Sequence, residues 1–419
     1  MENKRTCLYD KHVALGALMS PFGGFDMPIQ YSTIVDEHQA VRQSCGVFDV
    51  SHMGEVLVSG ADAERYVNHI FTNEVRGIPV GKILYGMMCY EDGGVVDDLL
   101  VYKMADDRFF LVINAANIDK DWAWIQQQAT GYDVALQHQS DEYGELAVQG
   151  PDAERVMQEV LGIPCAELAF YTFKEARGTS PEGEGTTAAQ GETAGEQAAA
   201  GTTAAQGKTA GEQAAAGTTA GEQAAQGTTA AAVTTAAVIV SRTGYTGEDG
   251  FEIYASPYYI NRCWDLLMAS GRCKPCGLGC RDTLRFEVGL PLYGDELSAD
   301  ITPIMAGLGM FVKLDKEEFI GRDALAKQKA EGPARKLIGI ELADKAIPRH
   351  GYTVLKDGQP IGEVTTGYHT ISTDKSVCMA LIDAQYAALG TEVEIQIRKK
   401  VFPGRVVKKQ FYNKNYKKN

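Results

Sequence analysis

The chain has 419 residues, more than one small hydrophobic core can organise, so we expect two or three domains. Its hydrophobic content of 45% and charged content of 23% are typical of a globular protein. The net charge of −15 disfavours nucleic-acid binding. No apolar run has the length of a membrane span, and the first seven residues lack the pattern of a secretory signal.

The first 130 residues alternate irregularly between helical and strand patterns. Hydrophobic spacing predicts helices at residues 32–44, 61–71 and 118–128, and strands at residues 55–58, 83–89, 95–103 and 108–113. An Asp-Gly pair between two of these strands predicts a hairpin. Residues 21–28 are expected to form a rigid, aromatic-rich turn. This irregular order favours an α+β domain over a doubly wound sheet.

A low-complexity segment interrupts the chain at about residues 178–235. It repeats short Thr, Ala, Gly, Glu and Gln motifs, and Val233 is its one large apolar residue. Such a composition cannot bury enough surface to offset the entropy of ordering. We therefore expect a disordered insertion at a hairpin tip, between strands at residues 169–174 and 236–241. A tether that binds a partner is the alternative.

The C-terminal region has short strand patterns separated by glycine-containing turns. Strands are predicted at residues 337–342, 352–355, 361–366, 377–382, 392–397 and 405–411. Six strands at this spacing predict a small β-barrel or Greek-key domain at residues 336–419, which follows a first region at residues 1–330.

The nine cysteines are odd in number and lie mostly within apolar patterns. Buried free thiols in a reducing compartment fit this usage better than a disulfide framework. Cys273, Cys276 and Cys280 lie close enough in sequence to suggest a zinc site. No second Cys or Cys/His pair lies nearby to complete four ligands, so we expect no metal.

Residues 241–252 form the densest motif, Ser-Arg-Thr-Gly-Tyr-Thr-Gly-Glu-Asp-Gly-Phe-Glu. Its glycines would let backbone approach a flat ligand closely. The acids argue against a phosphate loop, and their spacing argues against a calcium-binding EF-hand. A carboxylate accepts two parallel hydrogen bonds, which suits the N–H edge of a pterin ring. An acidic surface hairpin is the alternative.

Two further segments carry charged residues in informative positions. Asp97 and Asp98 lie inside an apolar strand, where neighbouring residues face opposite sides, so one carboxylate should point outward and the other into a cavity. An inward aspartate that only caps backbone amides is the alternative. Arg281 follows a glycine turn at a predicted helix start, where backbone donors attract anions. A surface network of Arg281, Asp282 and Arg285 is the competing interpretation.

Eleven motifs, taken in order, resemble the T-protein (aminomethyltransferase) family of the glycine cleavage system. The resemblance covers the chain outside the insertion, and its specificity lies in the ordered set rather than in any one motif. The motifs lie at residues 9–12, 21–24, 27–28, 48–54, 93–98, 114–117, 149–151, 241–252, 277–282, 289–294 and 349–351.

The resemblance implies a three-lobed ring, with two α+β subdomains, a C-terminal barrel and folate in a central channel. It implies transfer of the methylene carbon from the aminomethylated lipoyl arm of H-protein to tetrahydrofolate. The products are 5,10-methylenetetrahydrofolate, ammonia and dihydrolipoyl H-protein, and no metal is required. The catalytic carboxylate falls on Asp98. The folate-binding positions are Glu252, Arg281, Tyr85, Asn114, Tyr245 and, as a weaker contact, Tyr416.

Two other functions fit parts of the same pattern. One is a different folate enzyme, such as an O-demethylase or the folate domain of a methylamine-oxidising flavoprotein. The flavoprotein would need a Gly-x-Gly-x-x-Gly dinucleotide-binding unit, which the sequence lacks. The other is a non-enzymatic folate-binding factor for iron–sulfur assembly, whose Lys-Gly-Cys-Tyr-x-Gly-Gln-Glu-type motif is also missing.

Residues 398–419 contain lysines and arginines but no acid, in an otherwise acidic chain. We expect them to dock an acidic partner such as H-protein, or the glutamate tail of folate. A solvated strand and frayed tail is the alternative. Tyr412 and Tyr416 lie among the lysines, but no RNA-binding motif accompanies them. We expect a monomeric cytoplasmic enzyme, or one of the mitochondrial matrix if the source is eukaryotic.

Overall fold

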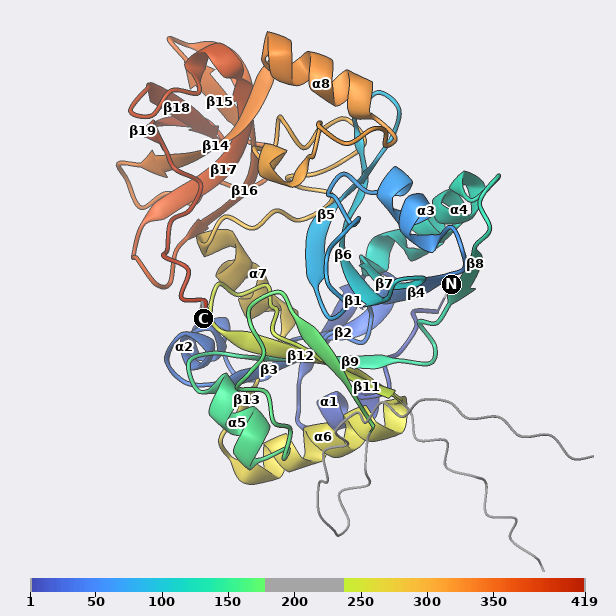
Figure 1. Ribbon diagram of the computed structural model, residues 1–419. Coiled ribbons are helices and arrows are strands. Elements are labelled where there is room, and N and C mark those ends of the chain that lie inside the picture. The colour runs from blue at the N-terminus through green and yellow to red at the C-terminus, as the bar shows by residue number, and fades with distance from the viewer. Residues whose placement is uncertain (1, 178–236, 418–419) are drawn as a thin grey trace, which may run out of the picture. The chain divides into compact units, whose positions relative to one another are not determined.

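The computed structural model describes residues 2–177 and 237–417 (Figure 1). The segment at residues 178–235, and with it the expected disordered insertion, lies outside these described residues. Among the helices of the described ranges, none combines the length and hydropathy needed to cross a lipid bilayer.

The first sheet is antiparallel, with the strand order β5-β6-β7-β4-β8. Helices α3 and α4 cover one face, where Tyr66, Trp124 and Ile125 join its hydrophobic core. Within the β5–β6 hairpin, Met87 lies opposite Asp98 and Met88 opposite Asp97. The elements are β4 Gly54–Ser59, α3 Ala63–Ile70, β5 Ile83–Cys89, β6 Val95–Ala105, β7 Arg108–Ile113, α4 Ile118–Gln128 and β8 Ala135–His138.

The second sheet has the order β10-β11-β12-β9-β3-β13, and it is antiparallel except for the β13–β3 pair. Helices α5 and α6 cover one face through Val156, Trp264 and Leu267. Ser256 caps α6 by accepting the Tyr259 N–H. The elements are β3 Gly46–Asp49, β9 Gly144–Gln149, α5 Ala153–Glu159, β10 Phe173–Arg177, β11 Ala237–Ser241, β12 Gly250–Ala255, α6 Pro257–Ser270 and β13 Lys274–Pro275.

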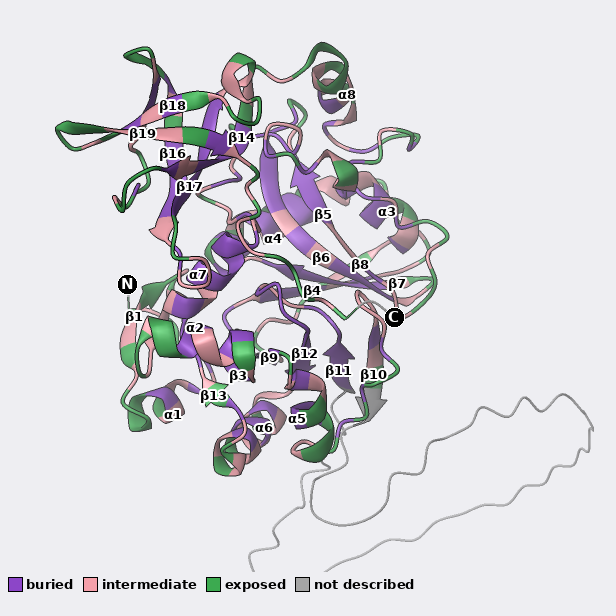
Figure 2. Ribbon diagram, turned by 90° about the vertical axis from the view of Figure 1, so that its left-hand side faces the viewer, coloured by how far each residue is buried: buried purple, intermediate pink, exposed green. Residues whose placement is uncertain are grey.

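The uncovered faces of the two sheets meet in a buried layer, visible as the purple strands of Figure 2. Phe110 from β7 and Phe173 from β10 contribute to it. The hydroxyls of Tyr102 and Tyr254 lie 3.0 Å apart there, which satisfies polar groups that would otherwise be buried without partners. The contact brings together β6 and β12, the strands that carry Asp98 and Glu252.

The C-terminal region is a closed barrel with the strand order β14-β17-β16-β15-β18-β19. Alternate residues fill its interior, including Ile340, Val364 and Ile395. The predicted α+β class and the predicted six-stranded barrel are therefore confirmed. The strands are β14 Arg335–Leu342, β15 Thr353–Lys356, β16 Gln359–His369, β17 Ser376–Asp383, β18 Glu392–Ile397 and β19 Lys400–Val407.

The remaining elements surround these sheets. Helix α7 packs against α2 and β2. Only glycine fits at its N-cap, because a Cβ on Gly277 would lie 2.3 Å from the Ile29 carbonyl. The elements are α1 Tyr9–Ala14, β1 Leu18–Phe22, β2 Phe25–Gln30, α2 Ile34–Gln43, α7 Leu278–Glu287, α8 Arg322–Glu331 and the 3-10 turns η1 Ala115–Asn117, η2 Gly309–Phe311 and η3 Ala384–Tyr386.

Three local predictions are wrong. Residues 169–172 form a turn and not the start of a strand, because Tyr171 has a φ of 60° and the Thr172 N–H donates to the Ala169 carbonyl. The last strand ends at Val407, because Phe411 leaves the barrel and its N–H donates to the Glu287 carbonyl. Residues 21–28 are not one turn, because β1 and β2 pair on either side of Gly23 and Gly24.

Candidate active site

Asp98 on β6 lies between two hydrogen-bond donors. The Tyr85 hydroxyl donates to Oδ2 at 2.9 Å, and the Asn114 amide donates to Oδ1 at 3.0 Å. Burial raises the pKa of Asp98 to about 7, and the neighbouring Asp97 charge adds to this, while the two hydrogen bonds act in the opposite direction. A carboxyl group of this kind can accept or release a proton near neutral pH.

Asp97 is fully buried, so the expectation that one carboxylate of the pair points outward is wrong. Its Oδ1 accepts hydrogen bonds from the side-chain amides of Asn114 at 2.9 Å and Asn117 at 2.8 Å. Its Oδ2 accepts the Asn114 backbone N–H at 3.1 Å. The turn η1, which carries Asn117, supplies these donors. Asp97 is therefore the aspartate that accepts a backbone N–H, which is the role considered above as the alternative for an inward aspartate.

The acids of residues 241–252 have different partners. Glu248 forms an ion pair with Arg42 at 3.0 Å, and Asp249 forms one with Arg242 at 2.6 Å. Glu252 instead meets hydroxyl groups. The motif is therefore not a solvated acidic hairpin, and Glu252 is the acid of the three that has no arginine within ion-pairing distance among the described residues.

The glycines of this segment make room for protein side chains. A Cβ on Gly244 or on Gly250 would lie 2.0 or 2.4 Å from the amide end of Gln149. Gly247 has a φ of 84°, and its Cβ would lie 2.4 Å from Val288. These glycines therefore let the backbone lie close to Gln149 and Val288, whereas the prediction was a close approach to a flat ligand.

Glu252 on β12 is 6% exposed, and its Oε2 accepts a hydrogen bond of 2.5 Å from the Thr243 hydroxyl. Tyr254 also donates to Oε2, at 3.4 Å. Oε1 accepts no hydrogen bond from the described residues. Burial raises the pKa of Glu252, and the Thr243 hydrogen bond and the Arg281 charge act against this. The carboxylate therefore has one oxygen held in place and another able to accept from a ligand.

Arg281 lies in the first half of α7, with its guanidinium 5.3 Å from the centre of the Tyr245 ring. Burial and then the Arg281 charge together lower the pKa of His52 to about 3, in keeping with a position of Arg281 near His52. The proposed surface network with Asp282 and Arg285 is wrong. Arg285 is buried and pairs with Asp282 at 2.7 Å and with Glu296 at 2.6 Å, and Arg281 lies outside this cluster.

Tyrosines lie between the strands that carry the two acids: the Tyr102 hydroxyl on β6 lies 3.0 Å from the Tyr254 hydroxyl on β12, and Tyr254 donates to Glu252. Burial raises the pKa of Tyr171, and the charges of Glu252 and Asp98 both raise it further. Burial likewise raises the pKa of Tyr85, with contributions from Asp98, Tyr245 and Tyr171. Because Tyr102 and Asp98 lie on the same face of β6, and Tyr254 and Glu252 on the same face of β12, both acids face the layer between the two sheets. Tyr171 was missed by the sequence interpretation, because it was assigned to a strand.

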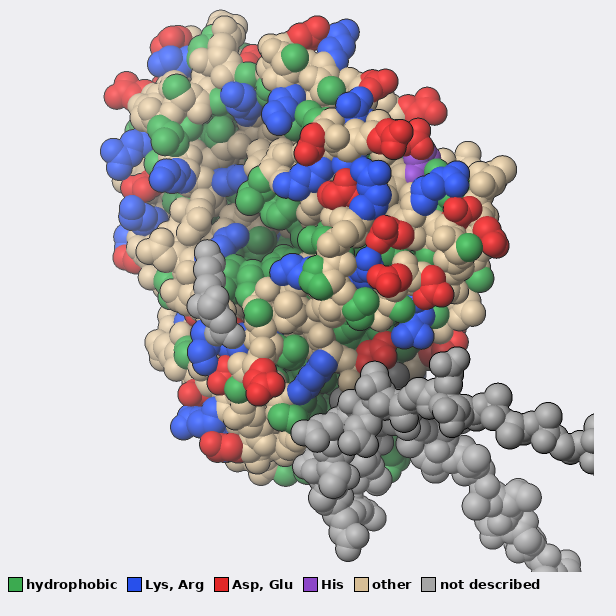
Figure 3. All heavy atoms as spheres, viewed as in Figure 1, with side chains coloured by type: hydrophobic (Ala, Val, Ile, Leu, Met, Phe, Trp, Pro, Cys, Tyr) green, Lys and Arg blue, Asp and Glu red, His purple; other side chains and the backbone are tan. Residues whose placement is uncertain are grey.

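The C-terminal tail lies along the Gly-rich segment. The Asn415 N–H donates to the Gly247 carbonyl at 2.7 Å, and the Tyr416 ring stacks on Phe170 with centroids 4.3 Å apart. Tyr416 thus neighbours Tyr171 through Phe170. Figure 3 shows that this face of the molecule is hollowed near its middle, where hydrophobic side chains gather with lysines and arginines around them.

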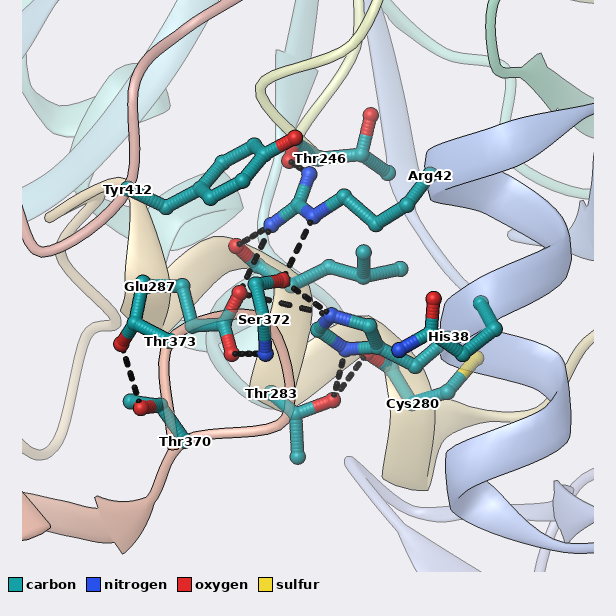
Figure 4. Close-up of polar contacts among 12 residues, drawn as sticks. His38, Arg42, Thr246, Cys280, Thr283, Glu287, Thr370, Ser372, Thr373 and Tyr412 are labelled. Atoms are coloured by element: carbon teal, nitrogen blue, oxygen red, sulfur yellow. Dashed lines mark hydrogen bonds and ion pairs between the residues drawn. The ribbon is translucent and has the colours of Figure 1, made fainter. Parts of the chain in front are cut away.

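A buried polar cluster fixes α7 between α2 and the barrel (Figure 4). Ser372, in the β16–β17 loop, donates its N–H to Glu287 at 2.9 Å. His38 contacts Thr283 at 2.9 Å, and Arg42 donates to the Thr246 carbonyl at 2.7 Å. Because these side chains join α7 to the Gly-rich segment, they hold Arg281 close to Tyr245.

The cysteines form no disulfide, and eight of the nine are buried. Cys273 lies 3.2 Å from Cys45, sulfur to sulfur, and Cys280 donates to the Gly277 carbonyl. The three clustered thiols therefore pack inside the protein, at the β3–β13 pair and the start of α7.

Comparison with known families matches both parts of the chain. Residues 8–180 and 214–316 match the GCVT N-terminal domain, and residues 335–413 match the glycine cleavage T-protein C-terminal barrel domain.

Similar proteins match along nearly the whole length. An aminomethyltransferase of Lysinibacillus sphaericus is 45% identical, with 99% of each chain covered, and one of Alkaliphilus oremlandii is 43% identical, with 100% of each covered. The crystal structure of the glycine cleavage system aminomethyltransferase T from Bartonella henselae is 28% identical, with a TM-score of 0.81 over 99% of both chains. The chain therefore belongs to the glycine cleavage T-protein family, and it is a tetrahydrofolate-dependent aminomethyltransferase.

Proposed function

We propose that Asp98 is the carboxylate next to the reacting carbon, and that Glu252 binds the N–H edge of the pterin ring. The observation that carries this assignment is the contact between the Tyr102 and Tyr254 hydroxyls, 3.0 Å apart, because each tyrosine shares a strand face with one of the two acids. Asp98, which is partly exposed, and Glu252, which is buried, therefore face the same layer between the two sheets. Tyr85, Asn114, Tyr245 and Arg281 line that space in this proposal, and Tyr416 contacts it from the tail.

The residue types fit a reduced folate. The ring edge offers two parallel N–H donors, and Glu252 has an oxygen that accepts no hydrogen bond from the described residues. Tyr245, held by its contact with Arg281, offers an aromatic face to the ring. Tyr85, Asn114, Tyr245 and Arg281 are each partly exposed, as expected of side chains that line a binding space.

The reaction breaks the carbon–sulfur and carbon–nitrogen bonds of the S–CH2–NH2 group and forms two carbon–nitrogen bonds to folate. The two folate nitrogens lose one proton each; one leaves with ammonia and the other returns to the lipoyl sulfur. The methylene carbon becomes cationic as its first bond breaks. The ionised form of Asp98, in a site of low dielectric constant, stabilises that charge and can accept the proton of the attacking amine.

The lipoyl-bearing H-protein is the proposed partner, and the basic C-terminal region its proposed docking surface. Arg398, Lys399, Lys400, Arg405 and Lys408 are exposed on or next to β18 and β19. Clustered positive charge speeds encounter with an acidic partner. Lys409 takes no part in this surface, because its ammonium donates to the Ala306 carbonyl.

Three further expectations stay proposals: a boundary between residues 1–330 and 336–419, a monomer, and a cytoplasmic location. The nine free thiols fit a cytoplasmic location, because the cytoplasm is a reducing compartment.

An assay with aminomethylated H-protein and tetrahydrofolate tests the function directly. The proposal expects ammonia and 5,10-methylenetetrahydrofolate in equal amounts. Formation of neither product by the folded enzyme would contradict it. Without H-protein, free aminomethylated lipoamide should support slower turnover.

A further inference from the structure

A second buried acid lies behind Asp98. Asp121 on α4 is fully buried, and neither of its oxygens accepts a hydrogen bond from an N–H or O–H of the described residues. The ammonium of Lys120 is 3.5 Å from its Oδ1, but it donates to the Val96 carbonyl and lies over the Tyr293 ring. Asn117, one helical turn before Asp121, donates its side-chain amide to Asp97 at 2.8 Å, so Asp121 lies on the side of α4 that faces Asp97.

Asp97 has the donors that Asp121 lacks. Three N–H groups point at its two oxygens, at 2.8, 2.9 and 3.1 Å. An ionised carboxylate has about four acceptor positions, so one position of Asp97 remains for a further donor. Two buried carboxylates side by side cannot both ionise at low cost. The proton therefore belongs on Asp121, from which it completes the hydrogen bonding of Asp97.

This arrangement decides how the Asn114 side chain is turned. Its amide nitrogen lies 2.9 Å from Asp97 Oδ1, 3.0 Å from Asp98 Oδ1 and 3.0 Å from the Asp98 carbonyl. Three acceptors on one side leave no place there for the amide oxygen. With the amide so oriented, Asn114 presents an N–H to Asp98.

We propose that Asp97 and Asp121 share one proton and together act as positioning residues that fix the Asn114 amide as a donor to Asp98. The inference rests on the proposed role of Asp98 in aminomethyl transfer. Burial, followed by the hydrogen bond to Asp97, raises the pKa of Asp121 to about 10, which agrees with a proton held there at neutral pH.

Charged groups around Asp97 and Asp121 also shift the pKa values of the neighbouring acids. Lys120 lowers the pKa of Asp121. The Asp97 charge raises the pKa of Asp98, and the hydrogen bonds from Tyr85 and Asn114 lower it. Removing the Asp97 charge should therefore shift the acid limb of kcat/KM to lower pH, by about one unit.

Infrared difference spectra of the folded enzyme test the shared proton without relying on activity. The wild-type minus Asp121→Asn difference spectrum at pH 9, where Asp98 is ionised, should contain a protonated-carboxyl band that belongs to Asp121. Asp119→Asn, an exposed acid of the same helix, should leave that band unchanged. A difference spectrum without that band would overturn the shared proton, whatever the activity of Asp98 variants.

Steady-state kinetics test the positioning role. Asp121→Asn keeps a donor for Asp97, so its kcat should stay within about threefold of wild type, with the same pH profile. Asp121→Leu should lower kcat roughly tenfold with little change in KM for tetrahydrofolate, and Asp97→Asn should show the shifted acid limb. Wild-type kcat in a folded Asp121→Leu enzyme, or an unmoved limb in Asp97→Asn, would overturn the role.

If Asp121→Leu does not fold, the acid limb of Asp97→Asn and the infrared band still test the proposal. Should Asp98→Asn be fully active, the proposed function fails separately, while the infrared result still stands.

Discussion

The Tyr85 hydroxyl donates a 2.9 Å hydrogen bond to Oδ2 of Asp98, across the β5–β6 hairpin. The donor and the acid lie two register positions apart, since Tyr85 pairs with Leu100 and Met87 with Asp98. Their side chains therefore share one face of the sheet. This hydrogen bond stabilises the ionised acid inside the protein, where burial disfavours charge.

Asp98→Asn should lower kcat by about two orders of magnitude or more while changing the Kd for tetrahydrofolate by less than threefold. The amide keeps the shape of the side chain but cannot stabilise a positive charge or accept a proton. Turnover under saturating H-protein and folate binding by calorimetry check the two halves. Near-normal turnover would show that a group other than Asp98 stabilises the positive charge and accepts the proton.

Tyr85→Phe should move the acid limb of the pH–rate profile upward. Asp98 must be ionised to act, so activity falls as the pH drops through its pKa, which is about 7. The Tyr85 hydrogen bond lowers that pKa, so its loss raises the pKa and less of the enzyme is active at neutral pH. The kcat/KM profile from pH 5.5 to 9 measures the shift. A limb that moves downward or stays in place contradicts the assigned hydrogen bond.

Glu252→Ala should weaken tetrahydrofolate binding by at least ~2 kcal/mol, about 30-fold in Kd, because it leaves buried N–H donors of the ring without an acceptor. Glu248→Ala offers a comparison, since that acid pairs with Arg42 and is assigned no ligand. Calorimetry on both folded variants separates the effects. Unchanged affinity in Glu252→Ala refutes the pterin contact.

Replacing residues 178–235 by a short Asn-Gly turn should leave the melting temperature and kcat nearly unchanged. The strands on either side pair in continuous register, from Phe173 opposite Ser241 to Arg177 opposite Ala237. A tight turn can therefore close the hairpin directly. Calorimetric unfolding and the H-protein assay check the shortened chain. A large fall in melting temperature means that the segment contributes to stability.

Much of the fold was predictable, because hydrophobic period sets local structure. Short apolar runs separated by glycine-containing turns predicted the strands of the barrel and the β5–β6 hairpin, and helical spacing predicted α2, α3 and α4 to within two residues. Tyr171 shows the limit. Its aromatic and β-branched neighbours favour a strand, but a positive φ and a backbone turn override that preference.

The site was predictable in its residue types and less so in its geometry. The motifs identify Asp98 and Glu252 as candidate acids, but strand alternation alone placed Asp97 in solvent. A turn and a helix from residues 115–128 cover that side of β6, and their position depends on tertiary packing. For the same reason, no sequence pattern indicates that Asp121 lies near Asp97.

A crystal structure of the enzyme with a bound reduced folate would show where the pterin ring lies relative to Asp98 and Glu252. We expect the pterin N–H edge to lie within about 3 Å of a Glu252 oxygen, and the nitrogen that accepts the carbon to lie beside Asp98. A pteridine ring bound away from both carboxylates would contradict this expectation.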